Sequence, residues 1–179
     1  MIAHIGGRVA ATVAVLALGG AGAIATQTSA SASTSSTFTA TYSCSVPGAG
    51  TETSTIDASL TASPNPATAG SVVGFALDVA SISVPPPVDI SSWTATAAIQ
   101  GSGTETSAFN ATASGGSIPA NQPITNVHMT GSWTPSASGT DTFAIGDIAI
   151  DMNAAALGSI TVSCTPSGTQ PTAGTLTVG

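Results

Sequence analysis

Residues 73–80 read Val-Gly-Phe-Ala-Leu-Asp-Val-Ala, and this stretch decides the fold class. Its large apolar residues stand at every second position, from Val73 to Val79. Side chains of a β-strand alternate between two faces, so this pattern places one apolar face against a core. The same spacing recurs over residues 93–99. The stretch therefore predicts a half-buried β-strand in an all-β protein.

Similar alternating runs lie on both sides of this stretch, separated by turn-forming Gly, Pro and Asn residues. They predict eight short strands, near residues 37–44, 53–61, 71–80, 92–100, 105–112, 124–133, 141–151 and 158–164. Abundant Ser and Thr and scarce Leu favour strands over helices. Strands of this number and spacing are typical of a two-layer sandwich, so we expect a single immunoglobulin-like β-sandwich of about 7–9 strands.

The predicted sandwich domain spans residues 33–166, and residues 167–179 read as a polar C-terminal tail with one short strand from Thr175 to Val178. Disorder is the alternative, because Leu, Ile, Val and Phe are few. Sparse charge and regular alternation favour a folded domain instead.

The N-terminus has the three parts of a secretory signal peptide. Residues 1–8 carry the only Arg, residues 9–25 are apolar and uncharged, and residues 26–32 are small and mostly polar. We expect the signal peptide to span residues 1–32, with cleavage after Ala25, Ala30 or Ala32. A retained membrane anchor is the alternative, but glycines interrupt the run, which is at the short end for a membrane span. The mature chain has no other candidate span.

Two cysteines in an exported chain predict one disulfide, Cys44 to Cys164. Each cysteine closes a strand-like run, over residues 37–44 and 158–164. Because both lie at the same end of their runs, we expect the two strands to be parallel neighbours. The expected inward residues are Phe38, Ala40, Tyr42, Cys44, Ile160, Val162 and Cys164.

Charge excludes several classes of function. The chain has one Arg, no Lys and eight acidic residues, for a formal net charge of −7. The Arg lies in the predicted signal peptide, so the mature chain has no Lys or Arg and no means of binding nucleic acid phosphates or anionic lipid. Schiff-base, P-loop and phosphoryl-transfer chemistry are excluded for the same reason. No cofactor is expected.

Three short motifs carry a family resemblance: Tyr42-Ser43-Cys44 followed by Pro47-Gly48, Asp151-Met152-Asn153-Ala154, and Val162-Ser163-Cys164-Thr165-Pro166. Over residues 37–166 the chain resembles a group of small secreted actinobacterial proteins of unknown function. The resemblance implies secretion, the disulfide and an immunoglobulin-like β domain. The tail beyond Pro166 departs from the usual ending of that group, which has no established active site to carry over.

Candidate chemical groups are few. His128 lies between the apolar Val127 and Met129, so we expect it to face the solvent. A Ser-His-Asp hydrolase would use it as the general base, but the sequence has no Gly-x-Ser-x-Gly motif for the nucleophile. Asp147, Asp151 and Asn153 share one side of a predicted strand, with Asp141 on the approach. Oxygen ligands on one face could hold Ca²⁺. The alternative is a solvated acidic face without a metal, which we favour because the spacing along a strand spreads these residues too far apart for one ion.

Trp93 and Trp133 could form an aromatic platform for sugar rings, or pack in the core as large rings commonly do. We expect a secreted or envelope-associated, non-enzymatic module with a structural, adhesion or surface-binding role. Its expected partner is cell-wall glycan or another envelope protein. The alternatives are a glycan hydrolase using an unassigned carboxylate pair, and a carrier of a small apolar ligand.

Overall fold

The computed structural model describes residues 32–48, 50–82, 85–154 and 157–179. These residues form strands and no helix. The strands are β1 (Thr34–Val46), β2 (Gly50–Ser63), β3 (Val73–Ile82), β4 (Ile90–Gly103), β5 (Ser107–Gly115), β6 (Ile124–Trp133), β7 (Gly139–Ala154), β8 (Gly158–Pro166) and β9 (Gly174–Val178). The eight expected strands are confirmed as β1 to β8. The predicted signal peptide lies outside the described residues except for Ala32.

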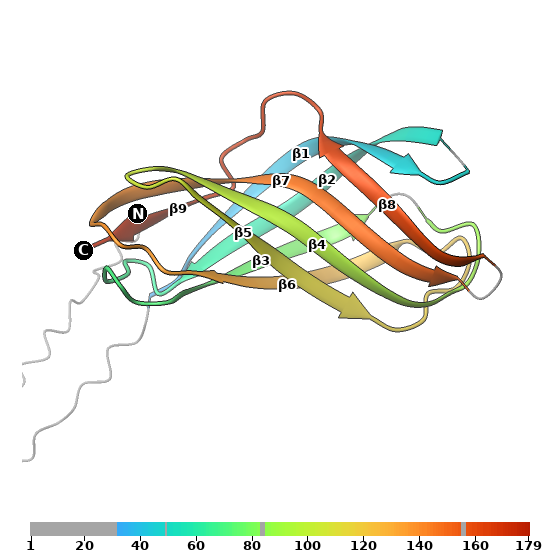
Figure 1. The fold of residues 1–179 in the computed structure, drawn as a ribbon, viewed down its shortest axis with the longest axis horizontal. Helices are drawn as coiled ribbons and strands as arrows, with labels where there is room; N and C mark the ends of the chain where they lie inside the picture. The colour runs from blue at the N-terminus through green and yellow to red at the C-terminus, as the bar shows by residue number, and fades with distance from the viewer. Residues whose placement is uncertain (1–31, 49, 83–84, 155–156) are drawn as a thin grey trace, which may run out of the picture.

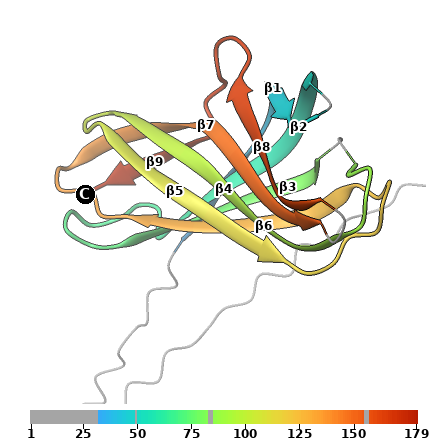
Figure 2. The same ribbon diagram turned by 45° about the vertical axis from the view of Figure 1, so that its right-hand side comes forward.

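The sheet closes on itself, so the predicted immunoglobulin-like sandwich is wrong. Antiparallel neighbours follow the order β4-β5-β6-β3-β2-β1-β8-β7, and β7 pairs in turn with β4. The result is an eight-stranded barrel (Figures 1 and 2). A sandwich and a barrel share the same alternation, because both bury one face of every strand. The pairing of β4 with β7, which removes the free edges of a sandwich, is a long-range contact that alternation does not encode.

One ladder of paired residues runs around the whole barrel and defines its stagger. It leaves β1 at Ser45 and returns to β1 at Ser35, a shift of 45 − 35 = 10 residues. The residues between them are Ser163, Ala149, Thr96, Thr112, Thr130, Ala76 and Thr61. Such a stagger tilts eight strands by roughly 40° to the barrel axis and leaves an interior that side chains fill. The residues of this ladder are rich in hydroxyl groups and uncharged.

A β-bulge interrupts the alternation of β7. Ala97 of β4 pairs with Ile148, whereas Ile99 pairs with Ile145, so β7 has one extra residue opposite β4. Before the bulge the odd-numbered residues are buried, and after it the even-numbered ones are. Asp141 consequently points into the barrel, where it is fully buried.

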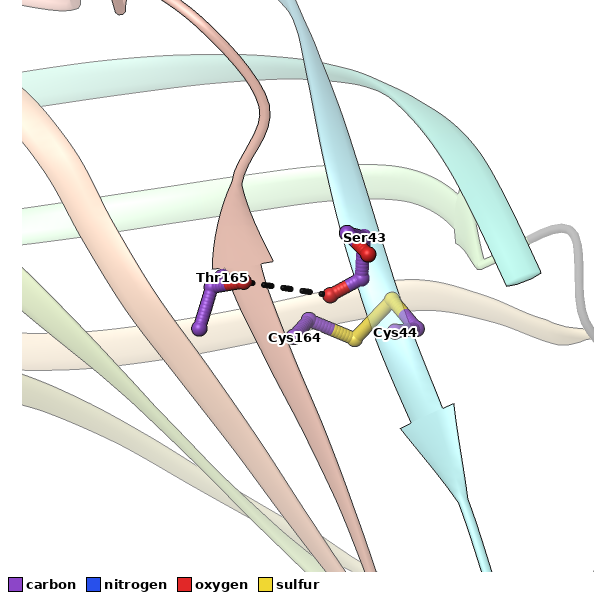
Figure 3. Close-up of a disulfide and its surroundings, with 4 residues drawn as sticks. All are labelled: Ser43, Cys44, Cys164 and Thr165. Carbon is purple, nitrogen blue, oxygen red and sulfur yellow. Dashed lines mark hydrogen bonds between the residues drawn. A yellow bond between two sulfur atoms is a disulfide. The ribbon is translucent and has the colours of Figure 1, made fainter. Parts of the chain in front are cut away.

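The disulfide between Cys44 and Cys164 is confirmed. It joins β1 to β8, and Thr165 Oγ1 donates a hydrogen bond to Ser43 O beside it, at 3.4 Å (Figure 3). The expected parallel arrangement is wrong, because β1 and β8 are antiparallel and the two cysteines are directly opposite each other. Position within a strand does not reveal strand direction.

The barrel has two different ends. At the "β9 end", β9 pairs with the first residues of β7, from Gly139 to Phe143. Leu176 and Val178 of β9 are buried there, although they belong to the segment predicted as a polar tail. Four aromatic rings meet at this end, those of Phe75, Phe109, Phe143 and Trp133, with ring centroids 4.8–6.1 Å apart. At the opposite "proline end", Pro85, Pro86 and Pro87 precede β4.

Candidate functional site

A hollow of about 660 Å³ lies on the outer surface of β1, β2, β3 and β6, and we call it the outer hollow. It is lined by Thr37, Phe38, Thr39, Asp57, Ala58, Ser59, Asp78, Val79, Ala80, Asn126 and Val127. Four strands that are distant in the sequence thus contribute to one surface. Its polar groups are hydroxyls, carboxylates and one carboxamide.

Strand alternation explains why the polar groups of the outer hollow face outward. Asp57 lies between Ile56 and Ala58, and both of these neighbours are buried in the core. Asp78 lies likewise between the buried Leu77 and Val79. Each aspartate therefore projects to the solvent side of its strand.

Each aspartate of the outer hollow has a side-chain partner on a neighbouring strand. Thr39 Oγ1 donates to Asp57 Oδ1 at 2.6 Å. Asp78 Oδ1 lies 2.6 Å from His128 Nδ1. The His128 and Asp78 side chains remain 59% and 53% exposed. These bonds orient the two carboxylates and leave them open to solvent.

Ser59, Asp78 and His128 are neighbours across three strands, but not in the order of a Ser-His-Asp triad. Asp78 pairs with Ser59 on one side and with His128 on the other. In a triad the histidine lies between the serine and the aspartate, because it takes the proton from the serine hydroxyl. Here the aspartate lies between them, so His128 does not meet Ser59 as a base.

Asp57 and Asp78 form a diagonal pair. Asp78 is opposite Ser59, which is two residues from Asp57 on β2. Diagonal neighbours in a sheet lie about 7–8 Å apart between Cα atoms. The outer hollow thus contains two orientated carboxylates at a spacing that several hydroxyl groups of one ligand can bridge.

Two of the residues proposed for Ca²⁺, Asp151 and Asn153, accept hydrogen bonds from β8. Asp147, Asp151 and Asn153 are all exposed. Asp151 Oδ1 accepts a bond of 2.5 Å from Thr161, and Asn153 Oδ1 accepts one of 2.9 Å from Ser159. The described residues contain no group of three or more His, Cys, Asp or Glu side chains able to hold a metal ion. The arrangement is that of a polar outer face.

The two tryptophans lie at opposite ends of the barrel. Trp93 is at the start of β4, near the proline end, and its indole covers Gly115. Trp133 ends β6 at the β9 end and packs against Phe143 with ring centroids 5.8 Å apart. Both rings are partly buried against the core. They do not come together as a shared platform.

An apolar cavity of about 50 Å³ lies inside the proline end. The disulfide and Pro85, Pro86 and Pro87 contribute to its wall. Pockets for small-molecule ligands commonly measure about 300–1,000 Å³. The cavity in this conformation has room for only a few carbon atoms.

Sequence reasoning did not find the outer hollow. The alternation around Asp57 and Asp78 does give their outward direction, but only the strand order places β2 beside β3 and β3 beside β6. His128 was predicted to face solvent, and its exposure agrees. Its pairing with Asp78 depends on a contact across 50 residues.

In comparisons with known proteins, no family model, curated protein or solved structure matches the chain. In the described residues, no helix is long and apolar enough to cross a membrane.

Proposed function

We propose that the protein is a secreted or envelope-associated, non-enzymatic barrel module that binds cell-wall glycan through the outer hollow. The observation that carries the proposal is the composition of that hollow. It presents orientated carboxylates from Asp57 and Asp78 beside hydroxyl groups and the Asn126 side chain. Carboxylates and carboxamides are strong partners for sugar hydroxyl groups, since they offer several acceptor positions.

Compartment and charge support this assignment. The disulfide is compatible with an oxidising extracellular environment. The signal-peptide pattern over residues 1–32 supports export. The net charge of −7 disfavours anionic polymers, which leaves neutral or cationic glycans as the matching class.

The exposure of the two aspartates favours binding over catalysis. A glycosidase general acid commonly sits in an apolar, desolvated pocket that keeps it protonated. Asp78 is instead more than half exposed and is paired with His128. Hydrolysis by the Asp57–Asp78 pair is the second candidate, because a diagonal spacing brings two carboxylates to one hollow.

A sedimentation assay tests the proposal. The mature protein is mixed with isolated cell walls and with purified insoluble glycans, and the bound fraction is measured. The Asp57→Asn and Asp78→Asn double variant should bind at least tenfold more weakly, because the loss of even one bond to an ionised group, about 1.5–3 kcal/mol, lowers the affinity by that factor or more.

The chain provides a matched control on another wall of the barrel. Asp151 accepts a bond from Thr161 just as Asp57 does from Thr39. Asp151→Asn should therefore leave binding unchanged. Equal losses in both variants, or no binding by the wild type, would exclude the outer hollow as a glycan site. Release of reducing sugar by the wild type would establish the hydrolase instead.

A further inference from the structure

One carboxylate joins two loops at the β9 end of the barrel. Glu105 lies in the tip of the β4–β5 hairpin, and its side chain accepts hydrogen bonds from the β6–β7 loop. The donors are the backbone N–H groups of Ser136 at 2.7 Å and Ala137 at 3.3 Å, together with the Ser136 hydroxyl. A single side chain thus holds the loop at three points.

The hairpin tip is itself hydrogen-bonded to β7, and these bonds hold the backbone of Glu105 in place. Its backbone N–H donates to Asp141 Oδ1 at 2.8 Å. Thr104 and Thr140 also exchange bonds: Thr140 N–H donates to Thr104 Oγ1 at 3.0 Å, and Thr104 N–H donates to Thr140 O at 3.3 Å. The loop, in contrast, meets the tip chiefly through the Glu105 carboxylate.

Few other charges influence this contact. The hairpin tip (103–107) and the segment from the loop into β7 (134–141) contain one other ionisable side chain, Asp141. The segment between β2 and β3 (64–72), whose Gly70 N–H donates to Pro135 O, has no charged side chain, and neither does β9, which pairs with the start of β7. Of the two carboxylates, Asp141 binds the backbone of the tip, and Glu105 is the one that binds the loop.

We propose that Glu105 acts as an acid-sensitive latch: its ionised carboxylate holds the β6–β7 loop against the tip of the β4–β5 hairpin, and its protonation releases the loop. The ionised carboxylate only accepts hydrogen bonds, and it does so more strongly than a neutral acid. Protonation turns one oxygen into a donor that faces the donors of Ser136 and Ala137. The loop then separates from the hairpin tip at Ser136 and Ala137, while Gly70 N–H still donates to Pro135 O at 2.7 Å and holds the start of the loop.

The direction of the pH dependence follows from the same bonds. Hydrogen bonds from Ser136, and a weaker one from Ala137, lower the pKa of Glu105 below its ordinary value of 4.5. The latch is therefore closed at neutral pH and opens as the pH falls through this lowered pKa.

Trp133 is a built-in reporter for the latch. It is the last residue of β6 and immediately precedes the loop, and its ring packs edge-on against Phe143. Release of the loop should expose this ring to water. The Trp93→Phe variant makes Trp133 the only tryptophan, since the chain has two.

The experiment is an acid titration of the Trp93→Phe protein, following Trp133 emission and far-ultraviolet circular dichroism together. We expect a red shift of the emission below pH 4.5 while the β-sheet signal is retained. An emission change that occurs only together with loss of the sheet signal would overturn the proposal.

Two further variants on the Trp93→Phe background separate the latch from general acid effects. Glu105→Gln offers one acceptor oxygen and cannot hold all three donors, so its emission should already be red-shifted at pH 7 and should not titrate. Glu52→Gln is the matched control, because Glu52 is the only other Glu of the chain and is exposed at the start of β2. A Glu105→Gln protein that titrates like the Glu52→Gln protein would also overturn the proposal.

Discussion

The pentapeptide Gly-Thr-Glu-Thr-Ser occurs twice, at residues 50–54 and 103–107, and shows what a single residue decides. In both copies the glycine has a positive φ and the serine is buried. The glutamates differ, however. Glu52 is exposed, whereas Glu105 binds the β6–β7 loop. The backbone differs as well, because residues 51–53 lie within β2 whereas residues 104–106 form the turn between β4 and β5. The same five residues thus take different conformations and roles, which the neighbouring elements decide.

Gly131 is required by a close approach of two strands. A Cβ at this position would lie 2.5 Å from Asn110 O and 3.2 Å from Ala111 Cα, both of them backbone atoms of β5. Because neither atom can move without shifting the strand, Gly131→Ala should destabilise the protein by roughly 1–3 kcal/mol. Urea unfolding measures the change. Gly116→Ala, where a Cβ meets nothing within 4 Å, is the control and should be nearly neutral.

Tyr42 links stability to alkaline pH. Its hydroxyl donates to Ile145 O at the β7 bulge at 3.3 Å, inside the barrel. Burial, with a smaller contribution from the negative charge of Asp147, raises the pKa of Tyr42 from 10.0 to about 12. The unfolded chain then releases the proton before the folded chain does. Stability from this group is complete below pH 10 and is lost as the pH rises through about 12, by about 2–3 kcal/mol in total.

Absorbance at the tyrosinate band measures this titration directly, because Tyr42 is the only tyrosine. Urea unfolding between pH 9 and pH 12 gives the matching loss of stability. Tyr42→Phe should remove the alkaline loss while lowering stability at pH 7 by about 0.5–1.5 kcal/mol. A titration midpoint near 10 in the folded protein would contradict the buried position.

At the scale of elements, the strands differ in how firmly they are paired. β4 and β7 pair from Ile90–Ala154 to Gly103–Asp141. β5 and β6 share a single register pair, Thr112–Thr130, and their backbones cross closely at Gly131. The β5–β6 contact is thus the least hydrogen-bonded seam of the described barrel.

Native-state hydrogen exchange should reveal this difference. We expect amides of β5 and β6 that face each other to exchange through local opening, well before those shared by β4 and β7. The side chains at this seam still pack, so the opening should not require global unfolding. Equal protection along all seams would show that the barrel opens only as a whole.

The eight strands of the barrel could be predicted, because alternation is a local property. Which strands are neighbours could not be predicted. For that reason the prediction also missed the closure of the barrel, the direction of β8 relative to β1 and the outer hollow. The bulge in β7 was also invisible, since Asp141 and Asp147 stand at positions of the same parity and yet face opposite sides. Alternation along a strand no longer predicts which side chains are buried once a bulge inserts one residue.

At the scale of the whole molecule, the disulfide reinforces a short seam. β1 and β8 pair only from Tyr42 to Ser45, and the bridge lies within this stretch. It links residues 120 apart in sequence, so it restricts the unfolded chain strongly. The Cys44→Ala and Cys164→Ala double variant should be less stable by about 2–5 kcal/mol. Urea midpoints of the two proteins measure the loss, and unchanged midpoints would show that packing alone closes this seam.

The sequence by itself determined the all-β class, the positions of the strands and the pairing of the only two cysteines. These follow from side-chain alternation and from elimination, which need no knowledge of distant contacts. Three features emerge only in the folded chain: the closure of the sheet into a barrel, the meeting of Asp57, Asp78 and His128 on one surface, and the contact of Glu105 with the β6–β7 loop. Each of these depends on which strands are neighbours, and that choice is made by the packing of the whole interior rather than by any one segment.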